Sequence, residues 1–172
     1  MPLVHNANEG SMTIDSIDMN PTNGAWGIVG DERGQGGYVP LWAGFDIRGD
    51  DRILPSVTGV IAYQRRRTVT RHDLRLIVVG DIIGQTSTPE TDTRVGLEEN
   101  IEYLRENVID PVNTMAGTRS AILTMPSGNT RIADIHVLSV TTQSYMLREC
   151  NSIWIATLHI SIPSGRFAYA SS

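Results

Sequence analysis

The residues best suited to chemistry in this chain are its histidines and its single cysteine, and their spacing argues against a reactive site. The four histidines are His5, His72, His136 and His159. No two of them lie at the short spacing of a metal-binding motif. His136 and His159 fall on predicted strands, where they could face each other across a sheet. Cys150 has no neighbouring base that could activate its thiol, so we expect ordinary sheet and turn residues.

Longer catalytic motifs are also missing from the sequence. It contains no nucleophile elbow, no P-loop and no dinucleotide-binding glycine pattern. The glycine-rich residues 34–37 are not followed by the Lys-Ser or Lys-Thr pair that phosphate binding requires. One cysteine can form neither an internal disulfide nor a zinc site by itself. We therefore expect a protein that is not an enzyme, with no catalytic residue, no metal site and no cofactor.

A cluster of arginines is the strongest local charge feature. It comprises Arg65, Arg66, Arg67, Arg71 and Arg75. On a strand, Arg65 and Arg67 share one face and Arg66 lies on the other. Such a patch can contact nucleic acid or an acidic partner, or it can protect an exposed strand edge from unwanted pairing. No aromatic stacking surface accompanies it, so a protein interface or edge protection is favoured over DNA binding.

Composition indicates one globular domain. The chain has 172 residues and a formal net charge of −5, and all 14 basic residues are arginines. An acidic chain has no general attraction for nucleic acid or for an anionic membrane. The N-terminus lacks the pattern of a signal peptide, and no apolar run is long enough to span a membrane. These features predict a protein that is cytosolic when made.

The first forty residues are predicted to be an arm, a strand and a loop. Residues 1–11 are polar and aperiodic, which indicates a flexible N-terminal arm, and residues 12–172 form a single domain. Residues 12–19 alternate, with one phase shift, as in a strand. A long glycine-rich loop is expected over residues 20–40, and long loops are often ordered by a partner. Trp26 within this loop must either fold onto the core or pack on a neighbour.

Later segments predict a mostly antiparallel β protein. Residues 73–83 are apolar on both faces and should form a central strand, preceded by a polar turn over residues 68–72. The last strand, residues 153–162, has one wholly apolar face. The other expected strands are residues 42–48, 60–67, 120–125 and 130–141, and residues 145–148 either extend the last of these or begin another.

Residues 91–108 carry the one clear helix pattern. Either Asp92 or Thr93 can serve as its N-cap, and Pro111 marks its end. A narrow stripe of apolar residues predicts that the helix lies on a sheet rather than inside a bundle. The stripe consists of Leu97, Ile101, Leu104 and Val108.

One stretch resembles a known family. Residues 45–59 contain an Arg-Gly pair and a Pro-x-x-x-Gly turn, residues 65–67 form a basic strand, and residues 74–82 form an apolar strand that leads into a glycine. This order resembles the distal tail proteins of long-tailed bacteriophages. The helix sequence over residues 99–104 and the closing strand over residues 160–167 are also similar to that family, so the resemblance spans most of the chain.

The resemblance implies a structural virion protein with a tail-tube-like β sandwich or barrel and one amphipathic helix packed on the sheet. Such proteins form rings, commonly hexameric, around a channel through which DNA passes. They contact neighbouring tail-tube and tail-tip proteins, and they are assembled in the host cytoplasm. The interface candidates are Trp26, Tyr38, Trp42, Arg48, Arg52, Tyr63, Arg65, Arg66, Arg67 and Arg71.

Two alternatives remain open. The same fold serves major tail-tube subunits and tail terminators, which would place the chain elsewhere in the tail. A different class is a small β module that binds carbohydrate or another ligand, with Trp26, Trp42 and Trp154 as a stacking surface. Because Trp154 lies on the apolar face of the closing strand, it is expected to belong to the core.

Overall fold

The computed structural model describes residues 3, 11–29, 46–47, 51–55, 61–65, 70–109, 118–125, 127–164 and 167–169. The strands are β1 (Ser11–Ile14), β2 (Ile17–Asp18), β3 (Trp26–Val29), β4 (Asp46–Ile47), β5 (Asp51–Pro55), β6 (Ile61–Arg65), β7 (Thr70–Val79), β8 (Ile82–Ile83), β9 (Thr88–Pro89), β10 (Arg119–Thr124), β11 (Thr130–Met146), β12 (Ile153–Ile162) and β13 (Ala168–Tyr169). The helix α2 (Thr93–Leu104) continues into a π-helical turn, η2 (Arg105–Ile109).

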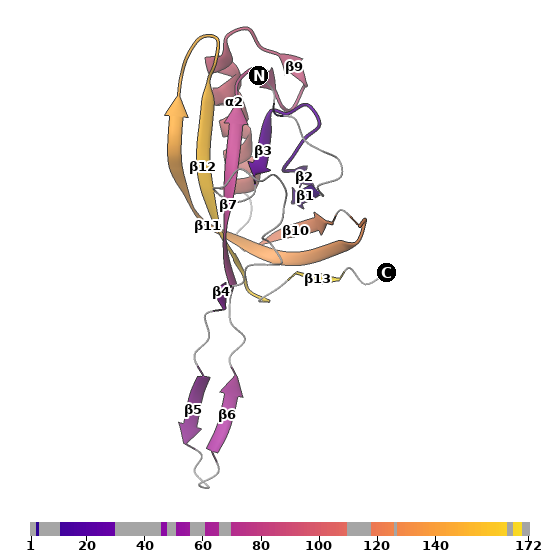
Figure 1. Ribbon diagram of the computed structural model, residues 1–172, viewed down its shortest axis with the longest axis vertical. Helices are drawn as coiled ribbons and strands as arrows, with labels where there is room; N and C mark the ends of the chain where they lie inside the picture. Colours follow the sequence, from indigo (N-terminus) through magenta and orange to yellow (C-terminus); the bar gives the residue numbers. More distant parts are fainter. Residues whose placement is uncertain are drawn as a thin grey trace.

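A single curled antiparallel sheet forms the body (Figure 1). Its strand order is β2-β1-β10-β11-β12-β7-β3, with β13 added to β11 and β4 added to β7. The 17-residue strand β11 belongs to both halves of the sheet, because its start pairs with β10 and its remainder pairs with β12. The prediction of a mostly antiparallel β protein with one helix is therefore confirmed, and the sheet has the form of a half-barrel.

The core lies on the concave side of this sheet, between the strands and the helix. Strand β12 shows the reason, since its residues alternate between buried and partly exposed positions. Its predicted apolar face is confirmed, because the residues concerned are all buried. They are Trp154, Ala156, Leu158, Ile160 and Ile162. Strand β7 lies between β12 and β3, so the prediction of a central strand is confirmed for residues 73–79.

Helix α2 has Asp92, one of the two predicted residues, as its N-cap, and it buries the expected stripe except for Ile101, which is partly exposed. The side chain of Asp92 accepts a hydrogen bond from the backbone N–H of Arg94. Leu97, Leu104 and Val108 are completely buried. Asn100 is buried too, and it ties the helix to the sheet by donating to the carbonyls at the ends of β7 and β8 at 2.9 and 2.7 Å.

Two glycines set how closely the helix approaches the sheet. A Cβ atom on Gly80 would lie 1.7 Å from the carbonyl oxygen of Thr93, and one on Gly96 would lie 2.1 Å from the carbonyl oxygen of Gly80. Neither position has room for a side chain. The Thr93 hydroxyl continues this contact by donating to the carbonyl of Arg148 at 2.7 Å, so the start of the helix is joined to both β7 and the turn between β11 and β12.

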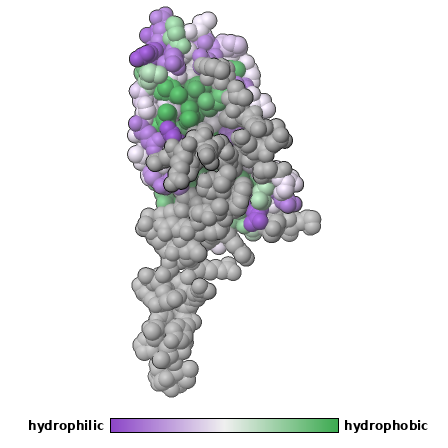
Figure 2. Space-filling view, in the orientation of Figure 1, coloured by the Kyte–Doolittle hydropathy of each residue, from purple (hydrophilic) through white to green (hydrophobic). Residues whose placement is uncertain are grey.

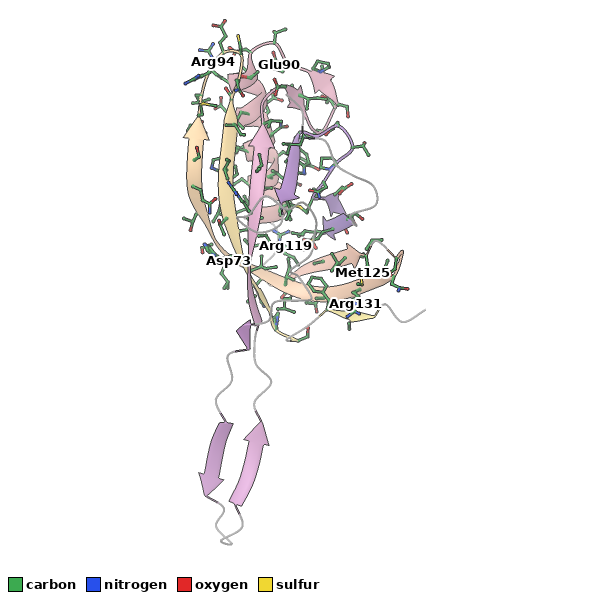
Figure 3. The ribbon with its side chains drawn as sticks, viewed as in Figure 1. Asp73, Glu90, Arg94, Arg119, Met125 and Arg131 are labelled. Atoms are coloured by element: carbon green, nitrogen blue, oxygen red, sulfur yellow. The ribbon has the colours of Figure 1, made fainter. Side chains whose placement is uncertain are left out.

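The N-terminal strands form a hairpin held by a buried arginine. Asp15 and Ser16 connect β1 to β2 with φ angles of +47° and +70°, the left-handed pair that tight hairpin turns require. Arg119 is 4% exposed and donates to Asp15 at 2.5 Å and to the carbonyl of Asn107 at 3.1 Å. Figure 3 shows Arg119 between the two halves of the curled sheet, where it links the hairpin, the helix end and β10.

Several predicted boundaries are wrong. The loop expected over residues 20–40 contains strand β3, because residues 26–29 pair with β7. The polar turn expected over residues 68–72 ends earlier, since β7 begins at Thr70 and pairs with β12 there. The strand expected over residues 73–83 stops at Val79, and residues 82–83 form a separate small strand. The expected arm ends before Ser11, which belongs to β1, and the N–H of Leu3 donates to the carbonyl of Gly24 at 2.9 Å.

Strands β5 and β6 form a hairpin of their own. They pair with each other over five residue positions, and neither pairs with a strand of the main sheet among the described residues. The hairpin follows β4 and precedes β7 in the chain, and it projects away from the body (Figure 1). No described helix is long and apolar enough to cross a membrane.

Candidate subunit interface

The second half of β11 is an edge of the main sheet. Residues 136–146 pair with β12 on one side. On the other side, β10 pairs only with residues 130–135, so no described strand continues the sheet on that side beyond residue 135. An edge strand presents backbone N–H and C=O groups that can pair with a strand of another molecule. This edge is the first part of the candidate interface.

Large apolar side chains lie along this edge. Leu138 is 50% exposed and Tyr145 is 54% exposed, and Leu147 just beyond the strand is 46% exposed. Two irregularities interrupt the pairing with β12, one between Val137 and Ser139 and one between Thr142 and Ser144. Bulges of this kind restrict uncontrolled edge pairing. The edge is therefore suited to a short, specific contact rather than to open-ended stacking.

A row of polar residues crosses the convex face of the sheet, opposite the helix. Nδ1 of His159 on β12 lies 2.6 Å from Oδ1 of Asp73 on β7, and its Nε2 lies 3.0 Å from Oγ1 of Thr141 on β11. A carboxylate, an imidazole and a hydroxyl in this order have the connectivity of a hydrolytic triad. However, Asp73 is 67% exposed, and all three residues stand on an open sheet face. We interpret the row as a tie across three strands.

Sequence reasoning missed this row. It expected no nucleophile, base and orienting group to come together, and it left open whether His136 and His159 face each other. The register places His136 opposite Ser161 and His159 opposite Ser139, so the two histidines are not a cross-strand pair. The three members of the row are 18 and 86 residues apart in the chain. No local motif can reveal such a set, because strand register alone brings it together.

An apolar patch occupies the same convex face. Ile155 pairs with Ile77, and Ile153 pairs with Val79, so these residues share the face that carries His159. Ile77, Ile153 and Ile155 are partly exposed. Figure 2 shows the patch as a green area over the upper parts of β12 and β7, bordered by hydrophilic residues. The patch is the second part of the candidate interface.

Trp26 belongs to the chain's own core rather than to a surface. It is 3% exposed, its indole N–H donates to the carbonyl of Asp18 at 2.9 Å, and its ring lies 5.7 Å from that of Tyr103. The structure thus places this predicted interface residue in the core of the single chain. The sequence allowed this outcome, since it predicted that Trp26 either folds onto the core or packs on a neighbour.

The other predicted interface residues divide into two groups. Arg52, Tyr63 and Arg65 lie on the β5–β6 hairpin, and Arg71 lies on β7 between Asp46 of β4 and Ser161 of β12. The remaining candidates lie outside the described residues. They are Tyr38, Trp42, Arg48, Arg66 and Arg67. The structure thus brings three of the predicted residues together on one hairpin.

The remaining reactive groups show no sign of a metal centre. No group of three or more histidine, cysteine, aspartate or glutamate side chains gathers among the described residues. Cys150 is exposed in the turn between β11 and β12, as a turn thiol would be. The clearest electrostatic effect is at the helix start, where the hydrogen bond from Arg94 lowers the pKa of Asp92.

Neither the known family models nor the curated proteins contain a match to this chain.

Proposed function

We propose that this chain is a structural subunit of a bacteriophage tail, forming a ring at the distal end of the tail tube through which DNA passes. The proposal is supported above all by the open edge of β11, which a neighbouring subunit would complete. A closed ring leaves no sheet edge exposed. The exposed Leu138 and Tyr145 would become buried on assembly, and the sequence resemblance described above agrees with this role.

The proposed subunit has no catalytic role and needs no cofactor. Its expected partners are further copies of itself, in a hexameric ring, and the adjoining tail-tube and tail-tip proteins. The chain as a whole is acidic, which suits a channel that does not hold DNA tightly. The expected location is the virion tail, after assembly in the host cytoplasm.

Electron microscopy and sedimentation velocity of the purified chain test this proposal. We expect closed rings of uniform diameter. Long tubes would favour a major tail-tube subunit, and a ring that binds only the upper end of a tail tube would favour a terminator. A particle that stays monomeric at high concentration would exclude the proposal.

A charge placed on the edge of β11 gives a sharper test. We expect Leu138→Lys to weaken self-association about tenfold or more, because a lysine would have to be desolvated at the edge. Val95→Lys is the matched control, since Val95 is 44% exposed but lies on helix α2 rather than on this edge. Equal sedimentation of wild type and Leu138→Lys would show that this edge does not carry assembly.

The carbohydrate-binding alternative loses support from the burial of its candidate residues. Trp26 is 3% exposed and Trp154 is 7% exposed, so neither offers a ring face to a sugar. Trp42 lies outside the described residues. No described group of aromatic residues favours this second function.

A further inference from the structure

The free edge of β11 lacks the features that usually prevent strands from pairing between molecules. Exposed edges in soluble proteins are normally protected by charged side chains or by proline. Residues 135–147 contain no Asp, Glu, Lys, Arg or Pro, although 19% of the chain is charged. From Leu138 to Tyr145 every residue except Val140 is exposed, and in Figure 1 no described strand lies on the outer side of this segment. The edge is therefore open to a further strand.

Side-chain hydrogen bonds hold the centre of this edge in its strand conformation. Three consecutive residues of β11 are each bonded to a side chain of β12. The bonded pairs are Thr141 and His159 at 3.0 Å, Thr142 and Trp154 at 3.1 Å, and Gln143 and Thr157 at 2.8 Å. A strand that is already ordered loses little conformational entropy when another strand pairs with it. The edge is thus prepared for pairing before a partner arrives.

The opposite end of the sheet is used by the chain itself. The backbone N–H of Ile28 on β3 donates to the carbonyl of Met19 at 3.2 Å and to Oδ1 of Asn20 at 2.7 Å, so β3 meets the residues that follow β2. Of the other described strands, β4 and β13 have two residues each, and the hairpin strands β5 and β6 have five residues each and include charged ones. The partner best matched to the long, uncharged edge of β11 is therefore the same edge of a second copy.

Symmetry fixes how two copies of this edge can pair. A contact between two copies of one edge is two-fold symmetric, and the two strands then run antiparallel. Neighbouring residues of a strand point to opposite faces and residues that pair across strands share a face, so the central residue must pair with its own copy. The bulges on either side leave residues 139–142 as the regular stretch. The centre of the contact therefore falls at Val140 or Thr141.

We infer that residues 139–142 of β11 pair in the antiparallel direction with the same residues of a second copy, so that one sheet continues through both chains. This inference rests on the proposed self-association and specifies its contact, because the edge of β11 joins its own copy rather than a different element of the neighbour. Each chain has one such edge, so chains associate in pairs. A ring built in this way contains an even number of chains, as a hexamer does.

Single-cysteine cross-linking of the full chain tests the symmetry of this contact. In the background Cys150→Ser, one introduced cysteine forms a disulfide rapidly only where it lies beside its own copy. We expect Val140→Cys or Thr141→Cys to give a cross-linked dimer on mild oxidation several-fold faster than Ile132→Cys. Ile132 is the matched control, because it is 39% exposed on the same strand but pairs with β10 and β13. Equal rates at all three positions would overturn the inference.

Charge substitutions at the centre of the edge test the same symmetry without cysteine. Thr141 is exposed. We expect Thr141→Arg and Thr141→Glu, each alone, to weaken association about tenfold or more in sedimentation velocity, because each new charge meets its own copy. A mixture of the two variants should associate again, because arginine then meets glutamate. If both variants are folded and their mixture shows no recovery, the inference is wrong.

The outcomes also separate this contact from the proposed ring. If Leu138→Lys abolishes association but neither Val140→Cys nor Thr141→Cys cross-links faster than the control, the edge of β11 joins a different element of the neighbour. The inference then fails and the ring proposal stands. If the wild-type chain does not associate at all, both fail.

Discussion

The body and the β5–β6 hairpin are built from the same kind of strand but are stabilised in different ways. In the body, β12 lies between β11 and β7 and packs its buried face against the helix. In the hairpin, each strand has one neighbour among the described elements. Burial of apolar surface is the main source of stability, and the described core lies in the body. Substitutions in the body should therefore change the free energy of unfolding more than substitutions in the hairpin.

The largest effect on folding is expected at the contact between helix and sheet. Gly80→Ala should lower the free energy of unfolding by about 3 kcal/mol, because the new methyl group would overlap the carbonyl of Thr93 and the helix would have to move. Denaturant unfolding measures the change. In the control Gly128→Ala no atom lies within 4 Å, so only backbone strain of about 1 kcal/mol is expected. Equal losses would show that this close approach is not essential.

The next largest loss of unfolding free energy is expected at the buried Arg119. Asp15→Asn keeps a residue that tolerates the left-handed turn but removes the carboxylate that accepts from Arg119. We expect a loss of about 2 kcal/mol, less than for a fully buried pair because Asp15 is 33% exposed. Adding Arg119→Met should recover part of the loss, since no buried charge then remains. A double variant less stable than Asp15→Asn alone would contradict this account.

A small effect on folding is expected in the hairpin. Ile53→Ser should change the unfolding free energy by less than about 0.5 kcal/mol, because β5 and β6 pair only with each other among the described strands and add no pairing to the main sheet. Denaturant unfolding of the monomer measures the change. A large loss in the monomer would remove the distinction between hairpin and body.

The smallest expected effect is on the pH dependence of the free energy of unfolding. The hydrogen bond from Arg94 lowers the pKa of Asp92 from its ordinary value of 3.8. This pair therefore adds stability above that value, and the contribution disappears as the pH falls through the lowered pKa of the folded state. Arg94→Gln should be slightly less stable than wild type at neutral pH, and the gap should close at acid pH. The Arg94 side chain is 50% exposed and that of Asp92 is 35% exposed, so added salt should also reduce the gap.

Local patterns predicted the elements better than the contacts between them. The apolar alternation of β12 and the apolar stripe on α2 were sufficient to predict these two elements. Each element buries one face, and that burial leaves a period in the sequence that identifies a strand or a helix. The strand at Trp26–Val29 was missed, since its short sequence is flanked by turn-forming residues and its pairing with β7 spans a long stretch of chain. The row of Asp73, Thr141 and His159 depends entirely on strand register, which no single segment specifies.

The connection between the hairpin and β7 has a mechanical consequence. The hairpin leads into the N-terminal end of β7, which pairs with β12 over ten consecutive residues. A pull on the hairpin along β7 would load this ladder in shear, so its hydrogen bonds would have to break together rather than one after another. The body should therefore resist a force applied at the hairpin better than a force that peels a strand from the edge of the sheet.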